Sequence, residues 1–252
     1  MTRKRLVIAN WKMYIESADG AKEFARTLKR KVRGISGVEV AVAPPAPFVA
    51  ALADILESSS VRVGVQSVSS RSGAHTGEVS AAMARSVGAD FAIIGHSERR
   101  ALGETNELVH QQLVQAASAG LMPVLCVGEI EHSEDGSHFA FVAEQLRTAL
   151  TGAQSLAGKL VVAYEPVWAI GKSAQDAMKP AEVREMGIFI RKTLADVLGR
   201  KAALKVPVLY GGSVEPENAH ALMLEGDVAG FLVGHASADV ISFVEIVLAC
   251  KK

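Results

Sequence analysis

The stretch Leu160–Gly171 reads LVVAYEPVWAIG, and it contains both a strand and a candidate catalytic residue. Its first four residues, through Ala163, are apolar and rich in β-branched side chains, as in a strand buried on both faces. Glu165 follows, and because it precedes Pro166 its backbone is biased towards extended geometry. Apolar residues continue to Gly171, where the missing Cβ lets a backbone N–H approach a ligand. The stretch fits a general base beneath an apolar flap, and it fits equally a solvent-facing glutamate at an ordinary strand end.

Seven other short apolar runs are of the same kind, and helical stretches separate them. They are Leu6–Ala9, Val38–Ala43, Val61–Val65, Phe91–Ile94, Met122–Val127, Val206–Tyr210 and Gly230–Val233. The clearest helix repeats apolar residues from Val183 to Val197 along one face. Eight strands that alternate with helices predict a parallel sheet, and eight is the number that closes a barrel. No shift in composition divides the chain, so we predict an α/β protein in which residues 1–252 form a single-domain (β/α)8 barrel.

The composition argues against several classes of function. Lys plus Arg and Asp plus Glu number 27 each, so no overall field would attract nucleic acid or an anionic membrane. The two cysteines, Cys126 and Cys250, form neither a disulfide framework nor a metal-ligand spacing, which is usual in a reducing compartment. No long apolar run follows the basic segment Met1–Arg5, so we expect neither a signal peptide nor a membrane anchor. We therefore expect a cytoplasmic protein without a nucleic-acid or membrane partner.

Polar residues gather where the predicted strands end. In a barrel the carboxyl ends of the strands share one rim, and that rim carries the active site. Some polarity is expected at the rim of any soluble barrel, but lysine, histidine and glutamate together favour catalysis. The residues at or just past a strand end are Asn10, Lys12, Gln66, His96, Glu98, Glu129, Glu165, Ser213 and His235.

Lys12 and His96 are the rim residues whose chemistry is most readily stated. A fixed ammonium at Lys12 would attract an anionic substrate and stabilise developing negative charge, although a lone lysine is usually only a surface residue. If a helical turn begins at Ser97, its positive end disfavours an imidazolium at His96, and a neutral imidazole can donate a hydrogen bond to a carbonyl oxygen. A lone histidine is more often structural. The other six histidines show no paired-ligand spacing, so we expect no catalytic metal.

Glycines follow the last three predicted strands, at Gly171, at Gly211–Gly212 before Ser213, and at Gly234. Barrels often bind phosphate in the loops after their final two strands, where backbone N–H groups surround the anion. A single glycine after a strand indicates only a tight turn. Three such sites in consecutive loops on one rim predict a phosphate-binding site.

Taken together, these motifs resemble the triosephosphate isomerase family, and the resemblance covers essentially the whole chain. The stretches that carry it are Asn10–Met13, Thr76–Glu78, Gly95–Arg100, Cys126–Glu129, Ala163–Gly171 and Tyr210–Val214. The resemblance implies a TIM barrel and a cofactor-free isomerase that interconverts dihydroxyacetone phosphate and D-glyceraldehyde 3-phosphate through an enediolate, in glycolysis and gluconeogenesis. A glutamate base and a neutral histidine electrophile are the known features of this family.

The same resemblance implies roles for individual residues of the catalytic centre. Glu165 would carry a proton between two neighbouring carbons of the substrate, and His96 would carry protons between its two oxygens. Lys12 and Asn10 would stabilise the negative charge of the enediolate.

Other residues would support and enclose this centre. Ser97 and Glu98 would order the site behind the catalytic groups. A flap from Pro166 to Ala174 would close over the enediolate and exclude water. The residues whose backbone groups would hold the substrate's phosphate are Gly171, Ser213, Gly234 and His235.

The family is also dimeric, with the loop after the third strand inserted into the partner subunit. In this chain that loop is Ser67–Val79, which is long for a barrel connection. It is therefore either a mobile solvent loop or, as the resemblance implies, the contact of a homodimer. Tyr14 and His75 differ from the family's usual residues and would lie at this contact.

Two further departures leave an alternative substrate open. The flap continues Gly171–Asp176 in a pattern unlike the family's, and His235 stands where a glycine is usual. They motivate an isomerase of a related ketose or aldose phosphate, such as a tetrulose phosphate, which a comparison of three- and four-carbon substrates would distinguish. A barrel without catalysis that serves as a binding protein is the third reading. The intact set of catalytic residues, Asn10, Lys12, His96 and Glu165, argues against it.

Overall fold

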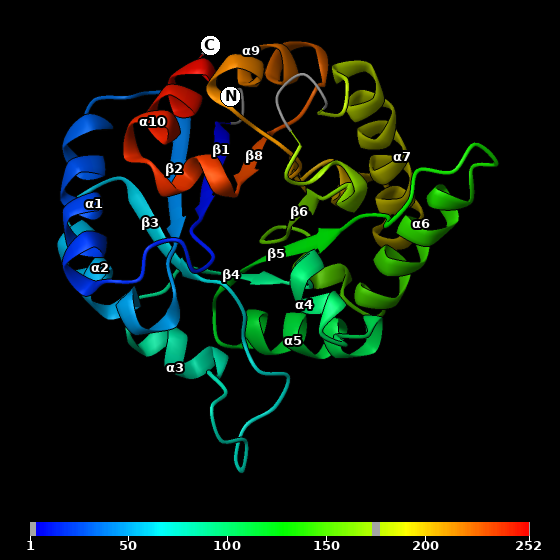
Figure 1. The fold of residues 1–252 in the computed structure, drawn as a ribbon. Coiled ribbons are helices and arrows are strands. Elements are labelled where there is room, and N and C mark those ends of the chain that lie inside the picture. Colours follow the sequence, from blue (N-terminus) through cyan, green and yellow to red (C-terminus); the bar gives the residue numbers. More distant parts are fainter. Residues whose placement is uncertain (1–3, 173–176, 252) are drawn as a thin grey trace.

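Eight parallel strands pair with one another in chain order, and the first also pairs with the last. The sheet therefore closes, which confirms the predicted (β/α)8 barrel (Figure 1). The computed structural model describes residues 4–172 and 177–251. The strands are β1 (Arg5–Asn10), β2 (Val38–Ala43), β3 (Val61–Val65), β4 (Phe91–Ile94), β5 (Met122–Val127), β6 (Val161–Tyr164), β7 (Val208–Tyr210) and β8 (Gly230–Val233).

Two strands begin later than the apolar runs predicted, and both differences have a backbone cause. β6 begins at Val161 because the N–H of Leu160 donates into the preceding turn. β7 begins at Val208 because the N–H of Val206 likewise completes a turn, and Pro207 has no N–H to donate. The apolar pattern thus marks which residues are buried, while hydrogen bonding decides where pairing starts.

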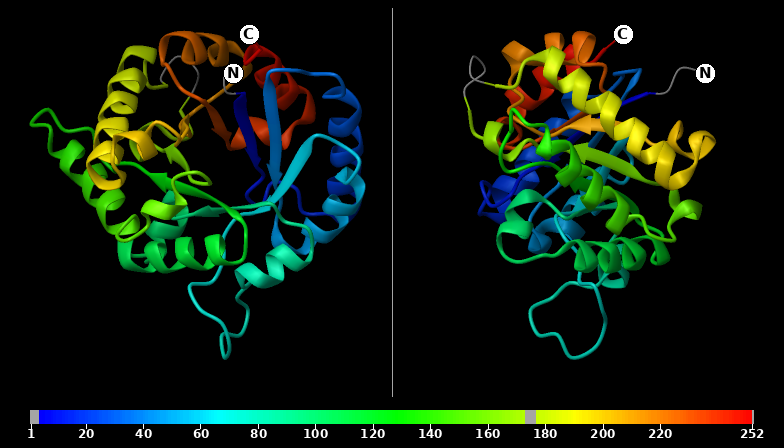
Figure 2. Two further views of the ribbon diagram at one scale, coloured as in Figure 1. Left: turned by 180° about the vertical axis from the view of Figure 1, so that it is seen from behind. Right: turned by 90° about the vertical axis from the view of Figure 1, so that its right-hand side faces the viewer.

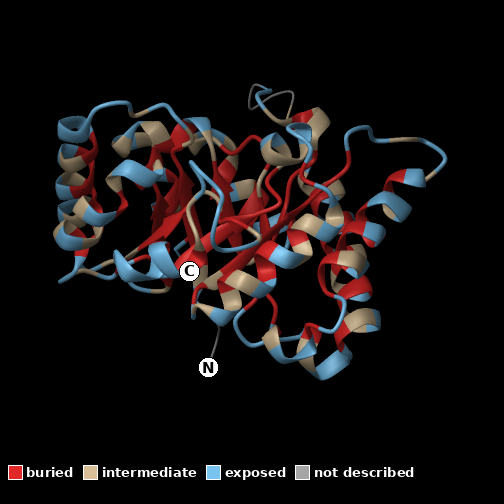
Figure 3. Ribbon diagram, turned by 90° about the horizontal axis from the view of Figure 1, so that it is seen from below, coloured by how far each residue is buried: buried red, intermediate tan, exposed pale blue. Residues whose placement is uncertain are grey.

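Helices surround the barrel and connect successive strands (Figure 2). The α-helices are α1 (Ala18–Lys31), α2 (Val49–Leu56), α3 (Ala81–Ser86), α4 (Ser97–Ala101), α5 (Asn106–Ser118), α6 (Ser137–Ala149), α7 (Pro180–Leu198), α8 (Arg200–Ala203), α9 (Pro216–Glu225) and α10 (Val240–Ala249). The 3₁₀ turns are η1 (Ala46–Phe48), η2 (Gln154–Leu156), η3 (Val167–Ala169) and η4 (His235–Ala238). The longer helices bury one face and expose the other (Figure 3), whereas α4, η1 and η2 contain no buried residue.

Helix α1 shows how the sequence specifies one of these elements. Ser17 caps its N-terminus, because the Ser17 Oγ accepts a hydrogen bond from the N–H of Gly20 (3.1 Å). Ala21, Phe24 and Leu28 recur at helical spacing, and all three are buried. Basic residues occupy the last turn, where they complement the negative end of the helix dipole.

Two apolar layers hold the barrel together, one inside it and one between the strands and the helices. Successive strand residues alternate between these layers, as Val7 and Ile8 do in β1. Phe91 fills the interior so closely that a Cβ added to Gly64 on β3 would lie 2.5 Å from its ring. The inner layer consists of Leu6, Ile8, Ala41, Ala43, Phe91, Ile93, Val124, Cys126, Val161, Ala163, Leu209 and Leu232.

The connection between β3 and α3 projects away from the barrel (Figures 1 and 2). Its base is closed by the N–H of Ser69, which donates to the carbonyl of Val79 (2.8 Å), and residues 71–78 are all exposed. Part of two expected segments, namely Met1–Arg3 at the N-terminus and Ser173–Ala174 at the end of the flap, lies outside the described residues. Within the described ranges, no helix is long and apolar enough to cross a bilayer.

Candidate active site

The carboxyl ends of the strands surround a cavity of about 210 Å³. All the residues predicted for catalysis and for phosphate binding line it, and they come from the ends of five different strands. They are Asn10, Lys12, His96, Glu165, Gly171, Ser213, Gly234 and His235. The structure therefore brings residues together that are more than two hundred positions apart in the sequence.

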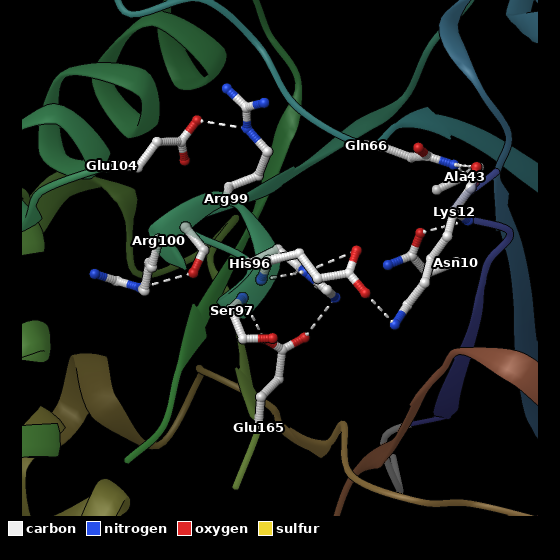
Figure 4. Close-up of polar contacts among 12 residues, drawn as sticks. Asn10, Lys12, Ala43, Gln66, His96, Ser97, Arg99, Arg100, Glu104 and Glu165 are labelled. Carbon is white, nitrogen blue, oxygen red and sulfur yellow. Dashed lines mark hydrogen bonds and ion pairs between the residues drawn. The ribbon is translucent and has the colours of Figure 1, made fainter. Parts of the chain in front are cut away.

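Glu165 lies directly after β6 and is only 2% exposed. Its N–H donates to the carbonyl of Val127 (2.8 Å), and Pro166 restricts the backbone on its other side. Its Oε2 accepts a hydrogen bond from the backbone N–H of Ser97 (3.0 Å), and its Oε1 lies 3.2 Å from Nε2 of His96 (Figure 4). The carboxylate is thus fixed in place at both of its oxygens.

His96 is the N-cap residue of α4, so the helical turn expected at Ser97 is present. Its Nδ1 accepts a hydrogen bond from the N–H of Glu98 (3.2 Å). A ring nitrogen that accepts carries no proton, so this geometry corresponds to a neutral imidazole with its proton on Nε2. That Nε2–H faces Glu165 and is the kind of donor that a substrate carbonyl needs.

Lys12 adopts a backbone φ of 46°, which is uncommon for a residue with a side chain. Two hydrogen bonds hold this conformation: the N–H of Lys12 donates to Oδ1 of Asn10 (3.2 Å), and Nε2 of Gln66 donates to the carbonyl of Lys12 (2.8 Å). The side chain then crosses Gly234, where a Cβ would lie 3.5 Å from Cε of Lys12. These hydrogen bonds hold the strained backbone of Lys12 in place, and its ammonium therefore lies at the cavity.

The two supporting residues act in different ways. Ser97 contributes its backbone N–H to Glu165, as described above. We expect Glu98 behind the catalytic groups, but its side chain is 58% exposed and forms an ion pair with Lys12. An anionic substrate that approaches Lys12 therefore has to share the ammonium with Glu98 or displace it.

At the other end of the cavity, Ser213 connects the loop after β7 to the expected flap. Its Oγ accepts a hydrogen bond from the N–H of Lys172 (3.1 Å) and donates to the carbonyl of Ala169 (3.0 Å). Gly234 follows β8, and His235 opens the turn η4 and is exposed. The loops after strands six, seven and eight therefore border the same cavity, as the glycine pattern predicted.

Helix α4 is held in place by Arg100, which is largely buried. Its Nε donates to the carbonyl of Gly95 (2.7 Å) and its Nη2 to the carbonyl of Cys126 (3.3 Å). The thiol of Cys126 is fully buried and contacts Glu165; burial, reinforced by this negative charge, raises the pKa of the Cys126 thiol well above its ordinary value. The thiol therefore stays protonated beside the Glu165 carboxylate and is not a nucleophile.

Glu129 forms a buried acceptor beneath the flap. Its Oε1 accepts hydrogen bonds from the hydroxyl of Tyr164 and from Nε1 of Trp168, both at 2.8 Å. Burial and the neighbouring Glu129 charge raise the pKa of Tyr164, so its phenol stays protonated and donates. Trp168 lies in η3, at the start of the flap. Through Glu129 it is connected to Tyr164, the last residue of the strand that precedes Glu165.

Several residues of the cavity and its support had no role assigned from sequence. Gln66 and Glu129 were placed only on the rim, and Arg100 appeared only as part of a motif. Tyr14 and Glu215 line the cavity although neither belongs to the predicted site. Gln66, Glu129 and Tyr14 contact partners distant in the sequence, so spacing alone carries no signal for them. No group of three or more His, Cys, Asp or Glu side chains able to hold a metal ion occurs in the described part of the chain.

Comparison with known proteins points to one family. A family model described as "Triosephosphate isomerase" matches residues 5–250. A triosephosphate isomerase of Carboxydothermus hydrogenoformans is 43% identical over 249 residues, which is 97% of this chain and 98% of that protein. One from Herminiimonas arsenicoxydans is 43% identical over 251 residues, 98% and 99% of the two chains. The crystal structure of triosephosphate isomerase from Bartonella henselae superimposes with a TM-score of 0.87 at 32% identity, covering 98% of each chain.

Proposed function

This chain belongs to the triosephosphate isomerase family and interconverts dihydroxyacetone phosphate and D-glyceraldehyde 3-phosphate, and we propose that Glu165, His96 and Lys12 carry out the reaction. One observation supports this assignment above all others. A carboxylate, a neutral imidazole N–H and an ammonium converge on one cavity of about 210 Å³. These are a base, a hydrogen-bond donor and a positive charge, the three groups that enediolate chemistry requires.

The proton transfers follow from the geometry of the free site. Glu165 removes the proton from the carbon beside the substrate carbonyl and returns it to the neighbouring carbon. In the free protein the Nε2–H of His96 faces Oε1 of Glu165 at 3.2 Å. A bound carbonyl oxygen would take over this donor, which frees that oxygen of the carboxylate to accept the carbon-bound proton. His96 then gives its Nε2 proton to one substrate oxygen, which leaves an imidazolate, and Nε2 takes a proton back from the hydroxyl on the neighbouring carbon.

Lys12 and Asn10 stabilise the negative charge of the enediolate. Asn10 itself fixes the backbone of Lys12, which keeps the lysine side chain at the cavity. Glu98 keeps the ammonium from relaxing into solvent in the free protein. When an oxyanion develops, Lys12 exchanges this exposed partner for one inside the cavity.

The phosphate group binds at the opposite end, among the backbone groups of Gly171, Ser213, Gly234 and His235. Such groups hold an anion without a large reorganisation, because their directions are set by the loops. The flap, expected over Pro166–Ala174, covers the enediolate, and η3 at its start is anchored through Trp168. Exclusion of water strengthens the electrostatic interactions inside the cavity and prevents side reactions of the intermediate.

A coupled assay with each of the two triose phosphates tests this proposal. The purified chain is expected to convert both substrates without added cofactor or metal, and Lys12→Met should lower kcat and raise KM, since it removes a charge that acts on both substrate and intermediate. Lys159, an exposed lysine outside the cavity, provides the matched control as Lys159→Met. Equal activity of the two variants would argue against the role of Lys12.

We propose that the chain forms a homodimer through the loop Ser67–Val79. The tip of this loop, residues 71–78, is exposed and projects from the barrel (Figure 2). Met13 and Tyr14, in the loop after β1, are 79% and 51% exposed, which is unusual for apolar side chains beside an active site. Sedimentation at micromolar concentration is expected to give a dimer or larger species, and a fully active monomer would contradict the proposal.

We also propose that residues 1–252 form one domain and that the protein is cytoplasmic. A single closed barrel that uses strands from both ends of the chain supports the first statement, and a single cooperative unfolding transition would test it. Cys126 and Cys250, both buried and unpaired, support a reducing compartment. Fractionation of cells that express the chain would test the location.

A further inference from the structure

The imidazole of His235 packs against the ring of Tyr14 at the phosphate end of the cavity. The ring centroids lie 5.2 Å apart at an interplanar angle of 75°, an edge-to-face arrangement. Both residues line the cavity, although they come from opposite ends of the sequence. The contact holds the His235 ring beside the cavity although the residue is exposed to solvent.

The fixed charges around the cavity leave little net attraction for a dianion. Its titratable lining residues, among those described, are Lys12, Tyr14, His96, Glu165, Lys172, Glu215 and His235. The two lysines and the two glutamates cancel one another, and Lys12 is also paired with Glu98. A positive charge on a histidine at this position therefore adds to a lining in which the other charges leave no net attraction for an anion.

Glu215 is the residue that opposes an anion at this end. It directly precedes α9, and its backbone N–H donates a hydrogen bond to Oδ1 of Asn218 (2.9 Å). Partial burial raises the pKa of Glu215, and the charge of His235 acts in the opposite direction. Both residues line the cavity, and the charge of His235 acts on the carboxyl group of Glu215.

We propose that the side chain of His235, when protonated, binds the substrate's phosphate group and offsets the carboxylate of Glu215. This goes beyond the backbone contact assigned above and rests on the proposed phosphate site. Histidine is the side chain that changes charge between about pH 5 and 8. The affinity of the site for a dianion therefore falls as the pH rises through this range, while the backbone contacts contribute the part that does not depend on pH.

Competition by sulfate provides the test, because sulfate keeps its two charges throughout this range and any pH dependence belongs to the protein. Its inhibition constant against triose phosphate is measured at constant ionic strength from about pH 5.5 to about pH 8.5. In the unaltered protein we expect it to rise about tenfold, the low end for a hydrogen bond to a charged group, because the ring is exposed. His235→Asn should bind weakly at every pH, and His235→Lys should keep tight binding at high pH.

Two further variants make the result specific. His220→Asn alters an exposed histidine of α9 outside the cavity, and it should keep the full pH dependence. Glu215→Gln should tighten sulfate binding at high pH, where the offset by His235 is lost.

Three results would count against the inference. If folded His235→Asn shows the pH dependence of the unaltered protein, the inference is wrong while the isomerase function stands. If Glu215→Gln binds sulfate no more tightly at high pH, the offset is wrong. If sulfate does not compete with the substrate at all, the proposed phosphate site fails, and the inference fails with it.

Discussion

Replacing Glu165 with aspartate moves the proposed base while keeping its chemistry. Loss of one methylene retracts the carboxylate by roughly 1 to 1.5 Å, about the length of one C–C bond. The carboxylate oxygens now lie 3.0 Å from the N of Ser97 and 3.2 Å from Nε2 of His96. Retraction by this amount takes both contacts beyond hydrogen-bonding distance.

The backbone cannot follow to restore these distances. Gly128 lies so close that a Cβ there would be 1.8 Å from the carbonyl oxygen of Glu165. The N–H of Glu165 is bound to Val127, and Pro166 restricts the next peptide. A misplacement of about 1 Å at a reacting group costs about 10²-fold in rate, which corresponds to about 2.7 kcal/mol in the activation barrier.

Steady-state kinetics in both directions would measure this effect. We expect kcat to fall about 10²-fold or more, with a smaller change in KM because the phosphate end is untouched. Glu185→Asp is the matched control, since Glu185 is exposed on α7, and it should leave kcat unchanged. A Glu165→Asp variant with kcat close to that of the unaltered protein would refute the assignment of Glu165 as the base.

Three other perturbations test neighbouring parts of the site. His96→Gln should depress kcat far more than it weakens substrate binding, because its Nε2–H acts on developing charge; unchanged turnover would exclude it as the electrophile. Gly128→Ala should lower both Tm and kcat, with a loss of about 1–3 kcal/mol or more in the free energy of unfolding, because the added Cβ meets the backbone of Glu165. Gly158→Ala is the control, since a Cβ there has open space and should be neutral, and equal Tm values for the two variants would contradict this reasoning. Cys126 should resist alkylation in the native state and react after unfolding. Because the pKa of its thiol is raised in the folded protein, the contribution of the buried thiol to stability should be lost as pH rises above about 8.5, and fast alkylation of the native protein would contradict both predictions.

Most of the barrel could be predicted from the sequence because burial on both faces leaves continuous apolar runs. Five of the eight runs coincide with strands at both ends, namely those beginning at Val38, Val61, Phe91, Met122 and Gly230. The starts of β6 and β7 could not be predicted in this way, because they depend on which N–H groups are hydrogen-bonded within the preceding turns. Apolar patterning reports burial, and only the backbone network reports pairing.

The candidate site was predictable to the extent that strand ends place residues on one rim. This rule brought Lys12, His96 and Glu165 together without knowledge of their contacts. It could not show that Glu98 faces Lys12, nor that Tyr14 packs on His235, because these contacts depend on side-chain direction across loops. The strained φ of Lys12 was likewise invisible, since it is imposed by hydrogen bonds from distant segments.

Turnover of a triose phosphate in D₂O, followed by proton NMR, tests the central claim most directly. If Glu165 carries a proton between the two carbons, its carboxyl group exchanges with solvent during the lifetime of the enediolate. Product and recovered substrate should then contain carbon-bound deuterium, and Glu165→Gln should abolish this labelling in a folded protein. Isomerisation without any deuterium at carbon, or labelling that persists undiminished in Glu165→Gln, would contradict the assignment.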